Sequence, residues 1–212
     1  MFITTRRSPS VLVRGPVEPR RLFFGLARRV LHPVLSTRNG PPVRPGTRRA
    51  GGVLLANAEV PHLDAIEALY RTAFRRRPPA GLLGRLLRLF PQLCFVGLHE
   101  GTVVAFALCS VELRTYLPPR RRGSAFLATI AVRDDFRGRG IARALVETLI
   151  DIAANDLGLP ELSLEVERDN EAAITLYESL GFLRVDGVRG ESPTSMFMAR
   201  PLSRTARPSE VG

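Results

Sequence analysis

The amino-acid sequence predicts an α+β fold. Two apolar runs rich in β-branched residues, at 93–98 and 103–111, are joined by His99-Glu100-Gly101, which indicates a hairpin of antiparallel strands. Apolar residues recur at helical spacing over residues 63–74, and Pro78-Pro79 stops that helix. The 212 residues provide for one domain of about 150 residues with loosely held ends.

The same two patterns place the other elements. A strand at residues 53–58 precedes the first helix, and a second short helix follows it at 82–90. Beyond an Arg- and Pro-rich loop at 113–123, strands and helices alternate. The expected elements there are a strand at 126–132, a helix from 140 to 155, a strand at 162–166, a helix at 170–179, and strands at 182–185 and 196–199.

Positive charge is concentrated in the first fifty residues. They hold 11 Arg against one acid, a balance of +10, whereas residues 51–212 hold 20 Arg against 19 acids, a balance of +1. The folded part therefore lacks the basic surface of a nucleic-acid-binding domain, and we expect no specific nucleic-acid partner. We interpret 1–50 as a disordered extension, 51–202 as the domain and 203–212 as a disordered tail. Residues 20–35 could form a short cationic amphipathic helix, so a weak contact with an anionic surface stays open.

The cysteines and histidines narrow the class of protein. Cys94 and Cys109 lie in predicted strands and give no disulfide framework, which favours buried thiols and a cytoplasmic setting. No apolar run reaches the roughly 18 residues of a membrane span. The three histidines are scattered, without a Cys or carboxylate at ligand spacing, so we expect no metal site.

The most informative segment is 133–143, RDDFRGRGIAR, which lies between an apolar strand and an amphipathic helix. Backbone N–H groups of a glycine-rich turn that opens a helix converge on one point, and the helix dipole adds positive potential, so a pyrophosphate can bind there. Small residues let the phosphates approach the backbone, and arginines add charge-assisted hydrogen bonds. The small residues are Gly138, Gly140 and Ala142, and the arginines are Arg137, Arg139 and Arg143.

Three other interpretations of this segment are possible. A dinucleotide-binding G-x-G-x-x-G fingerprint is disfavoured, because Arg143 occupies the third glycine position and no acid lies at a strand end about 20 residues further on. An RNA-binding Arg-Gly tract would be repetitive, whereas this one is single. Considered by itself, the segment is also consistent with an ordinary basic turn that binds no ligand.

Two ordered motifs resemble the GNAT superfamily of N-acetyltransferases. Arg137-x-x-Gly140-x-Ala142 looks like the family's R/Q-x-x-G-x-G/A acetyl-CoA motif. Residues 164–182, LEVERDNEAAITLYESLGF, are similar to its L-E-V-x-x-x-N-x-x-A-I-x-L-Y-x-x-x-G-F segment, most closely to that of ribosomal-protein alanine N-acetyltransferases. The resemblance covers residues 53–202 in element order and is strong over 127–182. It implies a mixed, mostly antiparallel central sheet with splayed parallel strands in the middle and helices on both faces.

The resemblance also implies where acetyl-CoA binds. In the family, the strands that match residues 127–132 and 162–166 splay apart and the pantetheine arm lies in the gap. Main-chain groups of Ile130, Ala131 and Val132 would then hold that arm, and an N–H there would stabilise the oxyanion by about 3 kcal/mol. The family uses the asparagine that matches Asn170 to meet the CoA arm; the residue alone indicates a helix N-cap.

Glu165 and Tyr177 are the candidate catalytic residues. An alkyl amine with a pKa of about 10 is almost wholly protonated at neutral pH, so a base must take its proton. Glu165 alternates with the apolar residues of its strand and points to the opposite face; the pattern alone fits a solvated residue, and the resemblance implies the general base. Tyr177 is a core aromatic or, by resemblance, the proton donor to the CoA thiolate. That transfer is uphill by about 1.5 pK units, which favours hydrogen bonding.

We therefore expect an acetyl-CoA-dependent N-acetyltransferase that acetylates a primary amine by direct transfer in a ternary complex. The acceptor, a small molecule, a protein N-terminus or a lysine, stays open, as does the choice between monomer and homodimer. Residues 186–195 lack the aromatics that ribosomal alanine acetyltransferases tend to carry there, so that substrate is not carried over. The alternative is a catalytically silent acyl-CoA-binding domain whose Arg-rich arm reaches an anionic membrane or nucleic acid. The intact Arg137, Gly140, Glu165 and Tyr177 argue against it.

Overall fold

The computed structural model describes residues 48–118, 122–188 and 192–204. The expected extension, apart from residues 48–50, and the helix considered at 20–35 lie outside these residues, and both stay predictions. So does the tail beyond residue 204. Among the described helices, none is long and apolar enough to cross a membrane.

One eight-stranded sheet in the order β1-β2-β3-β4-β5-β6-β8-β7 forms the centre of the domain. Neighbouring strands run antiparallel except β5 and β6, which are parallel. This is the mixed, mostly antiparallel sheet that the resemblance implied. The strands are β1 Arg49–Ala50, β2 Val53–Asn57, β3 Cys94–His99, β4 Thr102–Arg114, β5 Arg122–Val132, β6 Glu161–Glu167, β7 Leu183–Val185 and β8 Ser195–Pro201.

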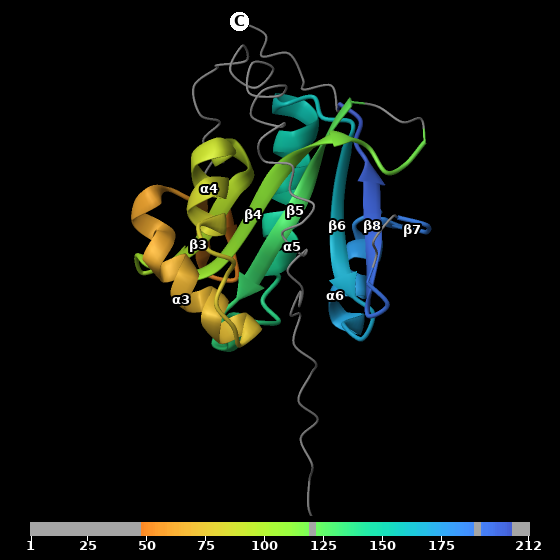
Figure 1. The fold of residues 1–212 in the computed structure, drawn as a ribbon. Coiled ribbons are helices and arrows are strands. Elements are labelled where there is room, and N and C mark those ends of the chain that lie inside the picture. Colours follow the sequence, from red (N-terminus) through yellow and green to blue (C-terminus); the bar gives the residue numbers. More distant parts are fainter. Residues whose placement is uncertain (1–47, 119–121, 189–191, 205–212) are drawn as a thin grey trace, which may run out of the picture.

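Helices cover both faces of the sheet (Figure 1). On one face lie α3 (Leu63–Phe74) and α4 (Leu82–Leu89), and on the other lie α5 (Ile141–Asp151) and α6 (Glu171–Ser179). The first pair turns apolar stripes to the sheet, because residues at helical spacing such as Ile66, Leu69 and Ala73 are buried. A π-helical turn at Ile152–Asp156 continues α5. The expected helices are thus confirmed, with ends that differ by a few residues.

Two differences from the sequence-based expectation concern strand ends. Arg49 and Ala50, expected in the extension, form β1 and pair with Leu54 and Val53 across a tight turn at Gly51-Gly52. The loop expected at 113–123 is shorter, because β4 runs to Arg114 and β5 begins at Arg122. In both places pairing with a neighbouring strand overrides a composition rich in Arg and Pro.

The two parallel strands separate part-way along their length. β5 and β6 pair only from Ala125 to Leu127 and from Leu162 to Leu164. Beyond that point β5 continues with β4 to Val132, and β6 continues with β8 to Glu167. The separation follows a β-bulge, since Leu127 pairs with Cys109 and Thr129 with Leu108, which leaves Ala128 as the extra residue. A bulge bends its strand, so β5 turns away from β6.

Candidate active site

The turn between β5 and α5 is built for close approach of a ligand to its backbone. Gly138 and Gly140 adopt φ values of 74° and 76°, which an L side chain rarely tolerates. A Cβ placed on either glycine would meet nothing within 4 Å among the described residues, so open space lies over both. Gly140 is the N-cap of α5, and the first N–H groups of that helix therefore have no carbonyl partner of their own.

The three arginines of the turn have different surroundings. The Arg137 side chain, 19% exposed, donates from Nε to Val132 O at 3.2 Å and lies 2.6 Å from Asp134 Oδ1, so it fixes the shape of the turn. Arg139 is exposed and lies 4.8 Å from the centre of the Phe136 ring. Arg143 is exposed and donates to Ser179 Oγ at 2.6 Å, which joins the start of α5 to the end of α6.

The start of the described chain supports the same turn. A Cβ on Gly51 would lie 2.6 Å from Arg139 Cβ, so the β1–β2 turn packs directly against the arginine. Arg48 donates to Thr148 Oγ1 on α5 at 3.3 Å. The short strand β1 is therefore part of the support for the glycine-rich turn.

The main chain of Ile130, Ala131 and Val132 lies in the part of β5 that has turned away from β6. These residues pair with β4, and their side chains are almost completely buried. No residue of β6 pairs with them. The edge of β5 that faces β6 is thus available there to an extended ligand, as strand edges are in general.

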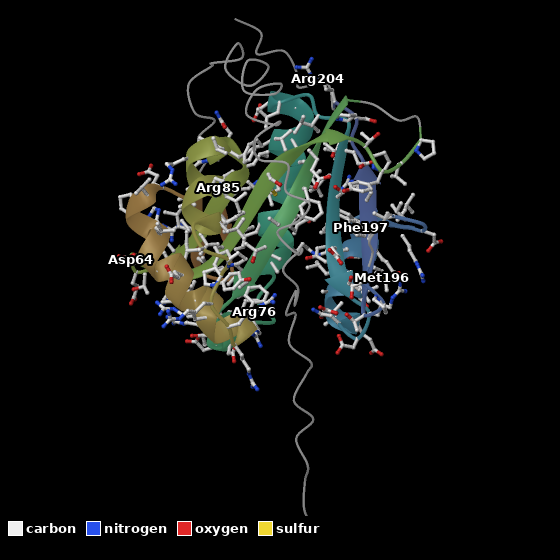
Figure 2. All side chains as sticks on the ribbon, viewed as in Figure 1. Asp64, Arg76, Arg85, Met196, Phe197 and Arg204 are labelled. Atoms are coloured by element: carbon white, nitrogen blue, oxygen red, sulfur yellow. The ribbon has the colours of Figure 1, made fainter. Side chains whose placement is uncertain are left out.

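Glu165 is the first residue of β6 beyond the last parallel pair, and its direct partner on β8 is Phe197. Figure 2 labels Phe197 on β8. It is half-buried, and one of its carboxylate oxygens accepts a hydrogen bond from Ser195 Oγ. Leu164 and Val166, on either side, are fully buried on the opposite face, as the alternation predicted. Glu165 therefore stands on the face opposite α6, where the two parallel strands part.

Tyr177 of α6 is fully buried, and its hydroxyl has no hydrogen-bond partner among the described residues. Its ring lies 5.5 Å from that of Phe182. Burial raises the pKa of the Tyr177 phenol, and the nearby Cys109 raises that pKa further. A buried hydroxyl without a partner costs about 1–3 kcal/mol, so this position favours a ligand that can receive or supply a hydrogen bond.

Asn170 is the N-cap of α6, as its sequence position predicted: Oδ1 accepts a hydrogen bond from Ala173 N at 3.2 Å. Its Nδ2 is buried without a partner among the described residues. The structure thus brings Asn170, Tyr177 and the glycine-rich turn to the α5/α6 side of the sheet and places Glu165 on the other side. A ligand between β5 and β6 can contact both sides.

Four residues at the site were not singled out from the sequence. Ser195 and Phe197 of β8 adjoin Glu165, and the register of β8 against β6 cannot be read from residue types. Tyr116 and Glu161 lie on the same face as Phe197. Of these, only Tyr116 carried a sequence signal, an aromatic residue in an otherwise Arg- and Pro-rich loop.

No cluster of three or more His, Cys, Asp or Glu side chains within residues 48–118, 122–188 and 192–204 has the arrangement of a metal site. Cys94 and Cys109 are free thiols in the core. Burial raises the pKa of Cys94 to about 12 and the pKa of Cys109 well above its ordinary value, so both are neutral thiols at physiological pH.

Comparison with known proteins identifies relatives of this chain. Residues 63–182 match the family model described as Acetyltransferase (GNAT) family. An N-alpha-acetyltransferase of Saccharolobus solfataricus is 30% identical over 155 residues, which cover 70% of this chain and 92% of that protein. N-alpha-acetyltransferase MAK3 of Arabidopsis thaliana is 38% identical over 96 residues, 45% of this chain and 47% of that protein, so the match spans about half of its length.

Solved structures share the fold. The ribosomal-protein-S18-alanine N-acetyltransferase from Escherichia coli superposes with a TM-score of 0.54 and 28% identity over 72% of this chain and 96% of that chain. Structures that superpose on this chain include complexes with CoA and with acetyl-CoA.

Proposed function

Because the chain belongs to the GNAT acetyltransferase family, we propose that it acetylates the α-amino groups of protein N-termini. It is an N-acetyltransferase with acetyl-CoA as co-substrate. The observation that carries the proposed acceptor is the 30% identity over 92% of an N-alpha-acetyltransferase. A ribosomal protein bS18 alanine N-acetyltransferase of Escherichia coli, 39% identical over 111 residues, also supports an α-amine.

The chemistry of an α-amine suits a single half-buried carboxylate. An α-amino group has a pKa of about 7.7, so about one molecule in six carries a free lone pair at pH 7, against about one in 2,500 for a lysine with a pKa of 10.4. The unprotonated, reactive fraction of an α-amine is therefore much larger than that of a lysine. A lysine acceptor would need a stronger base or a site that lowers the pKa of the lysine.

The residues present fit acetyl-CoA. The open space over Gly138 and Gly140, together with the first N–H groups of α5, forms a binding site for the pyrophosphate. The small side chain of Ala142 lets the phosphates approach the backbone. We assign Arg139 and Arg143 to ionic contacts with the phosphates, and Arg137 to holding the turn through Val132 O and Asp134.

The remaining cofactor-binding residues lie along the arm of the ligand. The edge of β5 at Ile130, Ala131 and Val132 pairs with the pantetheine, and Asn170 Nδ2, buried without a partner, supplies one donor. One N–H of this edge would also stabilise the negative charge that develops on the thioester oxygen, by about 3 kcal/mol.

Proton handling falls to Glu165 and Tyr177. Glu165 takes the proton of the acceptor amine, directly or through one water, while Ser195 orients its carboxylate. The lone pair of the neutral amine then bonds to the thioester carbon, the nitrogen releases its second proton to water, and the carbon–sulfur bond breaks so that the sulfur leaves as a thiolate. The Tyr177 hydroxyl donates a hydrogen bond to that thiolate; its raised pKa disfavours giving up the proton completely.

The test is an amine panel that reports thiol release from acetyl-CoA. Peptides with a free N-terminus are expected to support turnover, whereas matched peptides with a blocked N-terminus and one lysine, and small diamines, are not. Equal turnover of the blocked lysine peptide would contradict the proposed acceptor. Since acetyl-CoA and two free buried thiols suit a reducing compartment, we place the activity in the cytoplasm.

A further inference from the structure

The connection between β4 and β5 is fixed to β6 by a buried carboxylate. Glu161, 1% exposed, accepts hydrogen bonds from Tyr116 N and from Leu117 N, each at 2.7 Å. Hydrogen bonds from main-chain N–H groups to a charged, buried carboxylate are among the stronger ones in proteins. Thr115 Oγ1 closes the turn by donating to Leu117 O at 3.3 Å. The connection is therefore held in one position on the sheet.

This anchor places an aromatic ring against the strand partner of the candidate base. The Tyr116 ring lies 5.4 Å from that of Phe197, the direct strand partner of Glu165. Its hydroxyl donates to Glu112 Oε2 at 2.7 Å, which fixes the ring from its far end. Because side chains alternate along a strand, Glu161 and Glu165 point to the same face of β6, four residues apart. Glu161 therefore anchors the β4–β5 connection where β5 and β6 are paired, and Glu165 lies where the two strands have separated.

A small apolar core lies beside Glu165, under a partly exposed apolar rim. Phe126, Val185, Phe197 and Ala199 form a small core on this face, separate from the main core. Tyr116, Leu117 and Val188 pack against it and remain partly exposed. The candidate base is thus bordered by apolar side chains from the two strands of the final hairpin and from the β4–β5 connection, although the hairpin loop at 186–195 has no aromatics.

We propose that the partly exposed Tyr116 ring, which packs against the buried Phe197, receives the first side chain of the acceptor peptide, that this side chain is apolar, and that Glu161 is the positioning residue that holds Tyr116 in place. The inference rests on the proposed function. When the acceptor amine reaches Glu165 from the face opposite α6, the side chain of the same residue lies against these apolar groups. The carboxylates of Glu112 and Glu165 on the same face disfavour an acidic first residue.

The experiment measures kcat and KM for peptides that differ only in the first residue, Leu, Gly or Asp, with the acetyl-CoA KM in parallel. The wild-type protein is expected to prefer Leu over Gly by about tenfold in kcat/KM, and Asp to be poorest. Tyr116→Ala should raise the peptide KM for Leu about tenfold and remove the preference for Leu over Gly. Its kcat and its acetyl-CoA KM should stay within about twofold of wild type.

Two matched variants separate this role from general support of the fold. Tyr116→Phe keeps the ring and should retain the preference for Leu. Glu161→Gln keeps the shape but can accept only through one oxygen; it should raise the peptide KM about threefold at unchanged acetyl-CoA KM. A Tyr116→Ala protein that keeps the wild-type preference for Leu over Gly would overturn the inference. If the wild-type protein acetylates no peptide of the panel, the proposed function itself fails, and this inference falls with it.

Discussion

Replacing Gly140 with alanine is expected to weaken acetyl-CoA binding by about 10- to 100-fold. The new methyl group would stand in the open space over the turn, where a Cβ meets no protein atom within 4 Å and where the pyrophosphate is placed. It would keep at least one backbone N–H from the phosphate. A hydrogen bond to a charged group contributes about 1.5–3 kcal/mol, and each 1.4 kcal/mol is tenfold in Kd.

The same substitution also strains the backbone, and a matched control removes that effect. Gly81 is the N-cap of α4, with φ 69° and ψ 0°, against 76° and 4° for Gly140, and a Cβ there also meets nothing within 4 Å. Alanine at either position should cost about 1–2 kcal/mol of stability, or about 2–8 °C in Tm. The two glycines lie on opposite faces of the sheet, so only one of them can touch the pyrophosphate.

Isothermal titration calorimetry with acetyl-CoA and thermal melts of both variants give the comparison. Gly81→Ala should keep the wild-type Kd within about twofold, whereas Gly140→Ala should lose at least tenfold at a similar Tm. An unchanged Kd in Gly140→Ala, or an equal loss in both variants, would refute the placement of the pyrophosphate.

Further predictions concern proton handling, the core thiols and the chain start. Glu165→Gln should lower kcat/KM for a peptide by about 100-fold or more, most strongly below pH 7, where the amine is protonated; a pH–rate profile parallel to wild type would contradict the base. Tyr177→Phe should lower kcat about tenfold and, by removing an unpartnered buried hydroxyl, stabilise the protein by about 1 kcal/mol; a lower Tm would be inconsistent with this. Because burial raises the pKa values of Cys94 and Cys109, the unfolded chain loses these protons first, and stability should fall above about pH 9 by roughly 1.4 kcal/mol per thiol and pH unit; a Cys94→Ala/Cys109→Ala variant with the same slope in chemical denaturation would contradict this. A chain that begins at Arg48 should keep wild-type kcat/KM and Tm, and a large loss in either would show that the preceding residues contribute.

Most of the fold could be predicted because its elements carry strong local patterns. The helix at Leu63–Phe74 follows from its apolar spacing, and the hairpin follows from the two β-branched runs on either side of Glu100-Gly101. In the structure both turn residues have positive φ. The two-residue strand β1 carries no such pattern, since it depends on the Gly51-Gly52 turn and on pairing with β2. The bulge at Ala128 likewise has no recognisable sequence signal, although it bends β5 away from β6.

The candidate site divides in the same way. The glycine-rich turn, Glu165 and Tyr177 belong to contiguous motifs, and the resemblance of those motifs to the GNAT superfamily selected them as candidates. The partners of Glu165 come from β8, thirty residues further along the chain, and only the pairing of β6 with β8 brings Ser195 and Phe197 to it. Glu161 resembled an ordinary polar residue at the start of a strand, and its burial depends on a loop that folds back over the sheet.

The most direct measurement locates the acetyl group on a peptide that carries both a free α-amine and one lysine. After incubation of the purified protein with acetyl-CoA, fragment masses assign the acetyl group to one nitrogen or the other. We predict acetylation of the N-terminal nitrogen alone, and its loss in Glu165→Gln. Acetyl groups on the lysine, or undiminished N-terminal acetylation by Glu165→Gln, would contradict the account.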